Sequence, residues 1–246
     1  MQIKTDGLII RETNVGENDV IVTILTKENG IIRASAKGAR KLKNHCAAAV
    51  RLLCFSRFTL FRGREKYIIN DAEPIQIFVG LHKDLEKLAL SQYFAELCGV
   101  LAPEEENAEH FLRLILNAYH MIETDKRPLP LIKAAFEMRI LTLAGYMPDL
   151  VACCGCVAYE ADLMYLLPAS GKLCCDDCLE KDVLALPLSR GAVAAMRHIV
   201  FADFEKLFSF TLTDSTMKEL EKASESFLLR RLERSFKTLE FYKELK

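Results

Sequence analysis

The spacing of apolar residues changes near residue 80, and this change limits the possible folds more than any other feature of the chain. Before residue 80, β-branched residues gather in short segments such as GLIIRET (7–13) and DVIVTILT (19–26), which are typical of strands. After it, apolar residues recur every three to four positions, as they do on one face of a helix. The sequence therefore predicts a strand-rich N-terminal part followed by a helical body.

Five strands are expected in the N-terminal part. The turn Val15-Gly16-Glu17-Asn18 separates the first two, and Glu28-Asn29-Gly30 precedes the third. Two further strands, 51–61 and 66–72, flank Arg62-Gly63-Arg64. These turn signals divide the region into strands that are each short enough to pair with their neighbours in one sheet.

The third strand and the segment after it indicate which kind of barrel is formed. Alternation predicts two faces, with Ile32, Ala34 and Ala36 directed to a core and Arg33, Ser35 and Lys37 directed outward. The following segment KNHCAAAV (43–50) has the composition of a short helix. Five strands with a helix between the third and the fourth match the oligonucleotide/oligosaccharide-binding (OB) barrel.

Five helical patterns follow residue 80. Three of them end before Pro103, at Lys126-Arg127-Pro128 and at Gly145, which are common helix stop signals. Ser189 is expected to cap a fourth helix that runs through Phe201. Asp214 is expected to start the last one, whose inward apolar residues continue to Leu239. We expect these helices to form one body around a core of their own.

Six of the nine cysteines lie in two adjacent sequences, CCGC (153–156) and CCDDC (174–178). Cys153, Cys156, Cys175 and Cys178 give the spacing C-x2-C-x18-C-x2-C, which is typical of a four-thiolate zinc site. Two intervening residues let a tight turn direct both sulfurs at one ion, and four thiolates leave no open position for a substrate. The pattern predicts one structural zinc ion.

Neighbouring cysteines leave the ligand set open. Cys174 is the nearest substitute, since three residues separate it from Cys178, whereas only one residue separates Cys154 from Cys156. A metal-free hydrophobic hairpin is a further alternative. A redox site is less favoured, because no thioredoxin-like βαβ pattern surrounds either pair. The remaining thiols lie in apolar surroundings and are expected to be ordinary buried residues, namely Cys46, Cys54 and Cys98.

Basic residues are concentrated in the N-terminal part. Residues 33–66 contain ten lysines and arginines and one acid, Glu65, although the net charge of the whole chain is −1. A solvated loop is one interpretation, and a cationic groove that follows phosphates, with aromatic side chains for base stacking, is the other. The aromatics available are Phe55, Phe58, Phe61 and Tyr67, for which core packing is the alternative. The second interpretation predicts DNA contacts by Lys37, Arg40, Lys41 and Lys43 around Gly38, and by Arg33, Arg51, Arg57, Arg62 and Arg64.

No motif in the chain indicates catalysis. The chain contains no phosphate-binding glycine loop, no nucleophile elbow and no HExxH sequence, so we expect a binding protein and not an enzyme. The N-terminus has charges where a secretory signal needs apolar residues, and no charge-free stretch reaches about 18 apolar residues. A cytoplasmic location without membrane contact is therefore expected.

Together these patterns predict an α+β multidomain chain. An OB nucleic-acid-binding domain is expected at 1–80, followed by an all-helical body with an inserted four-cysteine zinc finger. The helical body is expected in two parts, 81–150 and 181–246, with the zinc finger between them at 151–180. Charge separated along the chain in this way is typical of two surfaces with different partners.

The order of these sequences resembles the bacterial recombination mediator family RecO over essentially the whole chain. The resemblance rests on GLIIRE from Gly7, on Glu17-Asn18-Asp19 before TILTKENG, and on AKGARKLKN, AAAVRLLCF and the double knuckle with GKLCCDDC. It implies the same fold, with Cys153, Cys156, Cys175 and Cys178 as zinc ligands and with Lys37, Arg40, Lys41 and Lys43 as the basic loop. The doubled cysteines depart from the family pattern, as does Gly155, which lies before Cys156 and not after it.

The resemblance also implies a function and partners. These are binding of single- and double-stranded DNA, annealing of complementary strands, and help in loading recombinase onto DNA coated by single-strand-binding protein, in association with the nucleoid. RecR and the acidic tail of single-strand-binding protein are the implied protein partners. The tail is expected to dock on the helical body, where the last predicted helix carries Arg230, Arg231, Arg234 and Lys237.

Two other classes of function stay open on sequence alone. One is an adaptor whose barrel binds RNA or protein and whose helices dock other proteins. The other is a nuclease or a thiol enzyme that uses the cysteine cluster. A closed four-thiolate site disfavours the second, because it offers no position to a substrate.

Overall fold

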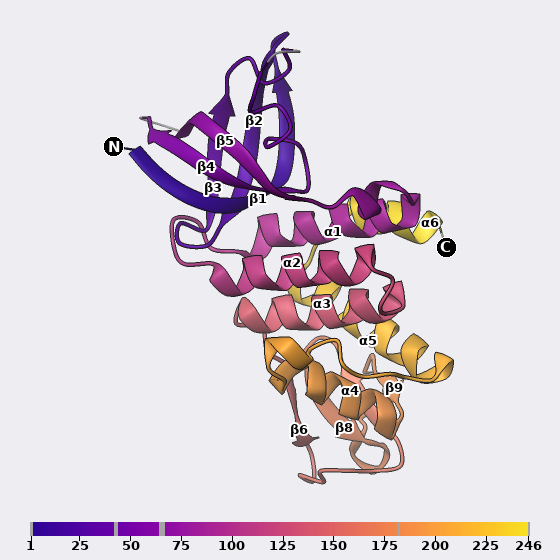
Figure 1. The fold of residues 1–246 in the computed structure, drawn as a ribbon. Helices are drawn as coiled ribbons and strands as arrows, with labels where there is room; N and C mark the ends of the chain where they lie inside the picture. Colours follow the sequence, from indigo (N-terminus) through magenta and orange to yellow (C-terminus); the bar gives the residue numbers. More distant parts are fainter. Residues whose placement is uncertain (1, 42–43, 64–66, 182, 246) are drawn as a thin grey trace. The chain divides into compact units, whose positions relative to one another are not determined.

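The computed structural model describes residues 2–41, 44–63, 67–181 and 183–245. Within them the chain divides into two compact units (Figure 1). The first unit comprises Met1–Thr124 and Phe236–Lys246, and the second comprises Asp125–Ser235. The chain therefore leaves the first unit, builds the second, and returns to the first for its last helix.

Five strands of the first unit form a closed barrel in the order β1-β2-β3-β5-β4 (Figure 1). They are β1 (Gln2–Val15), β2 (Asp19–Thr26), β3 (Ile31–Ala36), β4 (Cys54–Arg62) and β5 (Tyr67–Ile77). One half of β1 pairs with β2 and the other half with β4, while β3 and β5 close the barrel in parallel. The predicted five-stranded OB barrel is confirmed.

The interior of the barrel is apolar and is filled from every strand, with Ile9, Val22 and Phe58 among its fully buried residues. The predicted core residues of β3 are buried, and Arg33 and Lys37 are exposed as expected. Ser35 is the exception. It was expected to face outward but is buried, because β3 is a central strand at this point and Ser35 lies between Ile21 of β2 and Ile68 of β5.

Residues 45–50 form successive turns, and the expected short helix after β3 is wrong in this segment. The amide of Ala47 donates to the carbonyl of Asn44, three residues back, while that of Val50 donates to Cys46, four residues back. The Asn44 side chain also accepts from the amide of Cys46 at 2.8 Å. A segment this short cannot offset the cost of helix nucleation, so local side-chain hydrogen bonds determine its conformation.

Three α-helices complete the first unit, preceded by the short 3-10 helix η1 (Val79–His82). They are α1 (Leu85–Leu101), α2 (Glu109–Glu123) and α6 (Lys237–Glu244). Asp84 caps α1 through the amide of Glu86 at 2.8 Å. The helix α6 packs against α1, where the ring of Phe236 meets that of Tyr93 edge-on with centroids 5.8 Å apart.

The single last helix expected from Asp214 is therefore wrong. The pattern is divided between α5 (Asp214–Leu232) and α6, and Glu233 between them has a left-handed backbone with φ of +49°. Neither glycine nor proline marks the break. Its cause is tertiary, because Phe236 is buried in the first unit, whereas α5 belongs to the second.

The second unit combines three helices with a small sheet. The helices are α3 (Leu129–Leu143), α4 (Arg190–Phe201) and α5, with the 3-10 helix η3 (Phe204–Lys206) after α4. As predicted, Ser189 caps α4, since its hydroxyl accepts from the amide of Ala192 at 3.3 Å. None of the helices in the described part of the chain is both long enough and apolar enough to cross a membrane.

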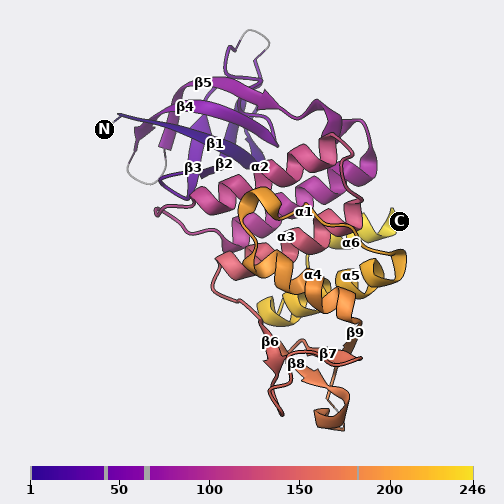
Figure 2. The same cartoon turned by 60° about the horizontal axis from the view of Figure 1, so that its bottom comes forward.

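The small sheet has the order β6-β8-β7-β9, and we call it the finger sheet. Its strands lie together beyond α4 and α5 in Figure 2. They are β6 (Asp149–Cys153), β7 (Met164–Leu167), β8 (Lys172–Cys175) and β9 (Leu186–Leu188), with the 3-10 helix η2 (Asp176–Cys178) after β8. Leu166 and Leu173 are fully buried within it.

A buried group of charges connects α3 with α5. The Nζ atom of Lys133 lies 2.8 Å from Glu137 Oε1 and 2.9 Å from Glu225 Oε2. The hydroxyl of Ser224 donates to Glu137 Oε2 at 2.7 Å. Burial raises the pKa of Glu137, and the charge of Lys133 and the hydrogen bonds to its carboxylate oppose that rise. The two helices thus have a polar contact inside an otherwise apolar interface.

Candidate metal centre and nucleic-acid interface

The pairing of two short strands brings the two cysteine knuckles together. Cys153 is the last residue of β6, and Cys156 lies in the turn that follows. Cys175 is the last residue of β8, and Cys178 ends η2. Because β6 and β8 run parallel, with Cys153 opposite Leu173, both strands deliver their knuckles to the same end of the finger sheet.

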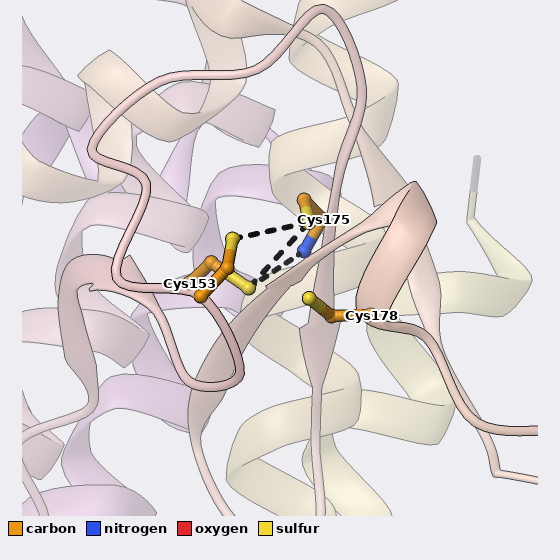
Figure 3. Close-up of side chains that lie close together, drawn as sticks. Cys153, Cys175 and Cys178 are labelled. Atoms are coloured by element: carbon orange, nitrogen blue, oxygen red, sulfur yellow. Dashed lines mark hydrogen bonds between the residues drawn. The ribbon is translucent and has the colours of Figure 1, made fainter.

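The four sulfurs lie close enough together to share one metal ion. Cys175 Sγ lies 3.6 Å from Cys153 Sγ and 3.7 Å from Cys156 Sγ, and all four Sγ atoms are within 4.8 Å of one another. Zinc–sulfur bonds of about 2.3 Å give sulfur–sulfur edges of about 3.8 Å in a tetrahedron. Figure 3 shows Cys153 and Cys175 directed toward each other with Cys178 beside them. The cluster could hold a metal ion.

Backbone amides prepare one of these thiols as a thiolate. Cys153 Sγ accepts from the amide of Gly155 at 3.4 Å and from that of Cys175 at 3.3 Å. Burial alone would raise the pKa of Cys153, but hydrogen bonds from the backbone amides of Cys156, Cys175 and Gly155 outweigh burial and lower that pKa to about 6. Thiolate is the form that binds metal.

The neighbouring thiols resist ionisation. Burial raises the pKa of Cys175, and its hydrogen bond with Cys153 raises it further. Hydrogen bonds with Cys175 and Cys156 raise the pKa of Cys178. Several negative sulfurs at these distances need a cation to balance them, so the donor set fits a soft divalent ion.

Gly155 lets the first cysteine knuckle lie close against the second. A Cβ atom at this position would lie 2.8 Å from Cys178 Cβ and 2.9 Å from Cys178 Sγ, which is too close for any other residue without a shift. The glycine inside the first knuckle is therefore required by the second knuckle, which passes directly against it.

Cys154 and Cys174 lie outside the group of four sulfurs. Cys154 is exposed, whereas Cys174 is buried on β8, where successive side chains point to opposite faces of the sheet. Burial, together with the nearby thiols of Cys154 and Cys153, raises the pKa of Cys174 to about 12. The structure brings together the four residues of the double C-x2-C spacing, and their role as ligands stays a prediction.

A row of side chains crosses the outside of the barrel on three adjacent strands. Arg11 on β1 is paired with Thr23 on β2, which is paired with Arg33 on β3, and we call these three residues the basic row. Both arginines are exposed. Strands about 4.8 Å apart place the two arginine backbones roughly 10 Å from each other. They stand on the β2–β3 side with which OB folds bind oligonucleotides.

Sequence reasoning missed Arg11 because of an irregularity in β1. The register with β2 shifts between Ile9 and Arg11, and the four residues 7–10 are all buried in succession. Strict alternation therefore fails just before Arg11. The only signal in the sequence is the arginine itself, at the end of an apolar run.

We call residues 37–44 the basic loop, and hydrogen bonds hold its described residues, 37–41 and Asn44, in place. The amide of Gly38 donates to Asp19 Oδ1 at 2.7 Å, and the amide of Arg40 donates to the carbonyl of Asn18 at 3.1 Å. Asn44 Nδ2 donates to the carbonyl of Gly38 at 2.9 Å. Gly38 has a φ of +63°, which favours glycine. The loop is thus fixed to the β1–β2 turn, an anchoring that the sequence did not reveal.

The predicted DNA-contacting residues fall into two groups according to their partners. Three arginines face carboxylates, since Arg57 makes two hydrogen bonds to Asp6 (2.9 and 3.1 Å), Arg62 lies 3.7 Å from Glu105, and Arg51 lies 3.5 Å from Glu12. Among the described residues, no carboxylate lies within 4.0 Å of the other predicted residues, Arg33, Lys37, Arg40 and Lys41, and the same is true of Arg11, which was not predicted. Lys43 and Arg64 lie outside the described residues.

The aromatic residues considered for base stacking differ in how deeply they are buried. Phe58 and Tyr67 are buried in the barrel core. Phe55 is half-buried, and the side chain of Phe61 is 51% exposed at the end of β4. Phe61 is thus the aromatic among these four that is open to a base.

The basic cluster expected on the last helix is not a single cluster. Arg230 and Arg231 belong to α5, Arg234 follows its end, and Lys237 begins α6 in the other unit. Arg231 donates to the carbonyl of Ser170 at 3.3 Å, so it supports the finger sheet. Arg230 is exposed on α5. The break at Glu233 is the reason that the four do not belong to one helix.

Comparison with known proteins gives one consistent result. The family model described as Recombination protein O N terminal matches residues 1–78, and that described as Recombination protein O C terminal matches residues 82–240. The DNA repair protein RecO of Acetivibrio thermocellus is 38% identical over 244 residues, which is 99% of this chain and 97% of the relative. The proteins of the same name from Symbiobacterium thermophilum and Desulforudis audaxviator are 34% identical (98% of this chain, 96% of the relative) and 31% identical (99% and 97%).

Proposed function

Because the chain belongs to the RecO family of DNA repair proteins, we propose that it is a non-catalytic recombination mediator that binds DNA through the outer face of its barrel. In this proposal it binds single- and double-stranded DNA, anneals complementary strands, and assists recombinase loading on DNA coated by single-strand-binding protein. Association with the nucleoid follows from DNA binding.

The observation that carries the proposal is the set of basic side chains without acidic partners. Arg33 and Arg11 on the basic row, and Lys37, Arg40 and Lys41 on the basic loop, are exposed and have no carboxylate within 4.0 Å among the described residues. Their charge is available to phosphates, and each phosphate they neutralise releases counterions. Phosphate contacts carry no base information, so binding independent of sequence is expected.

The arginines that face carboxylates take a secondary place. Arg57 and Arg62 would have to exchange Asp6 and Glu105 for phosphates. Their net contribution to the free energy of DNA binding is smaller than that of the residues without acidic partners, because the charge of each arginine is already partly balanced. We therefore assign the main contact to the basic loop and the basic row, with Arg57 and Arg62 at the margin and Phe61 as a stacking residue.

A charge-matched pair of triple variants tests this function. Lys37→Ala, Arg40→Ala and Lys41→Ala together should reduce the magnitude of the log–log salt slope on single-stranded DNA by about 2, from roughly 0.7 per contact. The control carries Arg51→Ala, Arg57→Ala and Arg62→Ala, which removes the same charge from the same barrel, and its slope should change by less than half as much. Equal slopes for both triple variants would point to net charge alone and would remove the basic loop from the proposal.

Strand annealing separates the mediator from an adaptor that binds RNA or protein. Purified chain should accelerate annealing of complementary strands in the presence of single-strand-binding protein, and the basic-loop variant should not. An adaptor would show neither acceleration nor a salt-dependent affinity for bare DNA.

We propose zinc as the occupant of the cysteine cluster, because four thiolates at tetrahedral spacing suit this ion and close its coordination shell. Cys153, Cys156, Cys175 and Cys178 would hold it, with the amides of Gly155 and Cys175 fixing the Cys153 sulfur. A closed site of this kind has a structural role. It argues against a thiol enzyme that uses the cluster.

RecR and the tail of single-strand-binding protein are the proposed protein partners. An acidic tail needs exposed basic residues on the helices, and Arg230 on α5 is the best placed of those expected. Arg230→Ala should weaken binding of a tail peptide to the full chain. Arg190→Ala is the control, because Arg190 lies 2.6 Å from Asp162 and already has a carboxylate partner.

A further inference from the structure

A second group of metal-ligating side chains lies on the barrel, apart from the finger sheet. His45 and Cys46 come from the turns that follow the basic loop, and Asp71 comes from β5. His45 Nε2 lies 3.0 Å from Asp71 Oδ1, and Cys46 Sγ lies 3.9 Å from the same oxygen. An imidazole, a thiol and a carboxylate therefore converge from two separate segments of the chain.

The spacing of these three atoms fits one divalent ion. Zinc bonds of about 2.0–2.1 Å to nitrogen, 2.0–2.2 Å to oxygen and 2.3 Å to sulfur give tetrahedral edges of about 3.4 Å for nitrogen–oxygen and 3.6 Å for sulfur–oxygen. The distances in the structure differ from these by less than about half an ångström. Within the described residues, this group and the four-cysteine cluster are the two places where three or more such ligands gather.

The burial of the three ligands sets how such an ion would be held. Cys46 is 7% exposed, whereas the side chains of His45 and Asp71 are 72% and 47% exposed. An ion here would sit at the surface, with the thiol below it and solvent above. Three protein ligands leave one position of a tetrahedron open to water or to an anionic oxygen, as in other three-ligand zinc sites.

We propose that His45, Cys46 and Asp71 form a second, open and exchangeable site for a divalent transition-metal ion of the zinc class. Asn44 connects this site to the basic loop, because its side chain accepts from the amide of Cys46 at 2.8 Å and donates to the carbonyl of Gly38 at 2.9 Å. A metal ion that fixes His45 and Cys46 to β5 also fixes the end of the basic loop. The site stands on its own ligands and does not depend on how the chain binds DNA.

Cobalt(II) is the probe that tests the site, because a thiolate ligand gives it a charge-transfer band that can be followed by absorption. Full-length protein with its finger metal in place should bind one further equivalent, and added zinc should displace it. His45→Ala and Asp71→Ala should each weaken cobalt binding by more than the 10–100-fold that loss of an outer-shell partner costs. Cys46→Ser should remove the band.

The controls distinguish this site from the finger and from misfolding. His82→Ala removes another exposed histidine of the same unit and should leave cobalt binding unchanged. His45 is itself exposed, so His45→Ala tests the site even if replacement of the buried Cys46 disturbs folding. Binding of no further equivalent at millimolar cobalt would overturn the proposal. A band of equal strength in His45→Ala would do the same, since it would arise from cobalt in the four-cysteine cluster.

Discussion

The barrel and the finger sheet differ in the length of their strands and in whether the strands enclose an apolar core. Barrel strands have 6 to 14 residues and enclose a core filled from all five of them. Finger strands have 3 to 5 residues. They contain a few buried leucines, and the sheet they form contacts α4 and α5. At the end of the finger sheet where β6 and β8 finish, four cysteines lie in place of an apolar core.

This difference shows how the two sheets obtain their stability. A closed barrel leaves no free sheet edge and buries enough apolar surface to fold around itself. Short strands outside a large core are marginal in water and need a further constraint, such as a metal. We therefore expect the barrel to tolerate metal removal, while the knuckle end of the finger sheet should not.

Removal of one thiolate should give the largest effect. Cys153→Ser should abolish metal binding and open the knuckle end of the finger sheet, because structural zinc contributes about 10–16 kcal/mol of apparent binding free energy in small finger peptides. Hydrogen exchange should show lost protection near residues 149–178 and unchanged protection in β1–β5. Cys154→Ser is the matched control and should retain both metal and protection. Loss of protection in the barrel as well would contradict the contrast between the two sheets.

The helices next to the finger sheet should be sensitive to a broken charge pair. Lys133→Met leaves Glu137 buried without its ammonium partner, and loss of one partner of a buried pair costs about 3–5 kcal/mol of unfolding free energy. Denaturant unfolding measures this cost. The double variant with Glu137→Gln should recover part of it, because the amide carries no charge and still accepts from Ser224. A double variant no more stable than the single one would show that packing, and not charge, explains the loss.

Closer packing at the knuckle should weaken the metal site without removing a ligand. Gly155→Ala places a Cβ 2.8 Å from Cys178 Cβ, and such overpacking costs about 1–3 kcal/mol. Competition with a chelator should show that loss as lower metal affinity. Gly99→Ala is the control. Gly99 lies within α1, and a Cβ there would be at an ordinary contact distance of 3.6 Å from Ile10 Cδ1. This substitution should raise the free energy of unfolding by about 0.5–1 kcal/mol, because alanine favours a helix more than glycine does. Unchanged metal affinity in Gly155→Ala would mean that the knuckles shift freely.

The smallest effect on stability is expected on the barrel surface. Asp19→Ala removes the acceptor of the Gly38 amide and should cost about 0.5–1.5 kcal/mol. Affinity for single-stranded DNA should nevertheless fall, although the substitution removes a negative charge, because the basic loop loses its anchor. Asp6→Ala removes a negative charge beside Arg57 and leaves the loop intact, so its DNA affinity should stay the same or rise. Higher affinity in both variants would mean that charge alone governs binding.

Features that depend on local sequence were predictable. The OB barrel, the cap at Ser189 and the convergence of the four cysteines follow from alternation, capping preference and spacing. Features that depend on distant contacts were not. Glu233 breaks a helix without glycine or proline because Phe236 packs on Tyr93, and Arg57 is paired with Asp6 across 51 positions of the chain. The register shift before Arg11 likewise depends on pairing with β2.

The return of the last helix to the first unit has a consequence for biosynthesis. The barrel and α1 leave the ribosome early, yet Phe236, Leu239 and Tyr242, which are buried in that unit, are made only after the whole of the second unit. At about 5–20 residues per second, translation of the chain after residue 124 takes roughly 6–24 s. During this interval the face of α1 that contacts α6 is uncovered, and the second unit is itself incomplete until α5 has been made. The earlier-made unit therefore keeps part of its core open until the whole of the later-made unit has been synthesised.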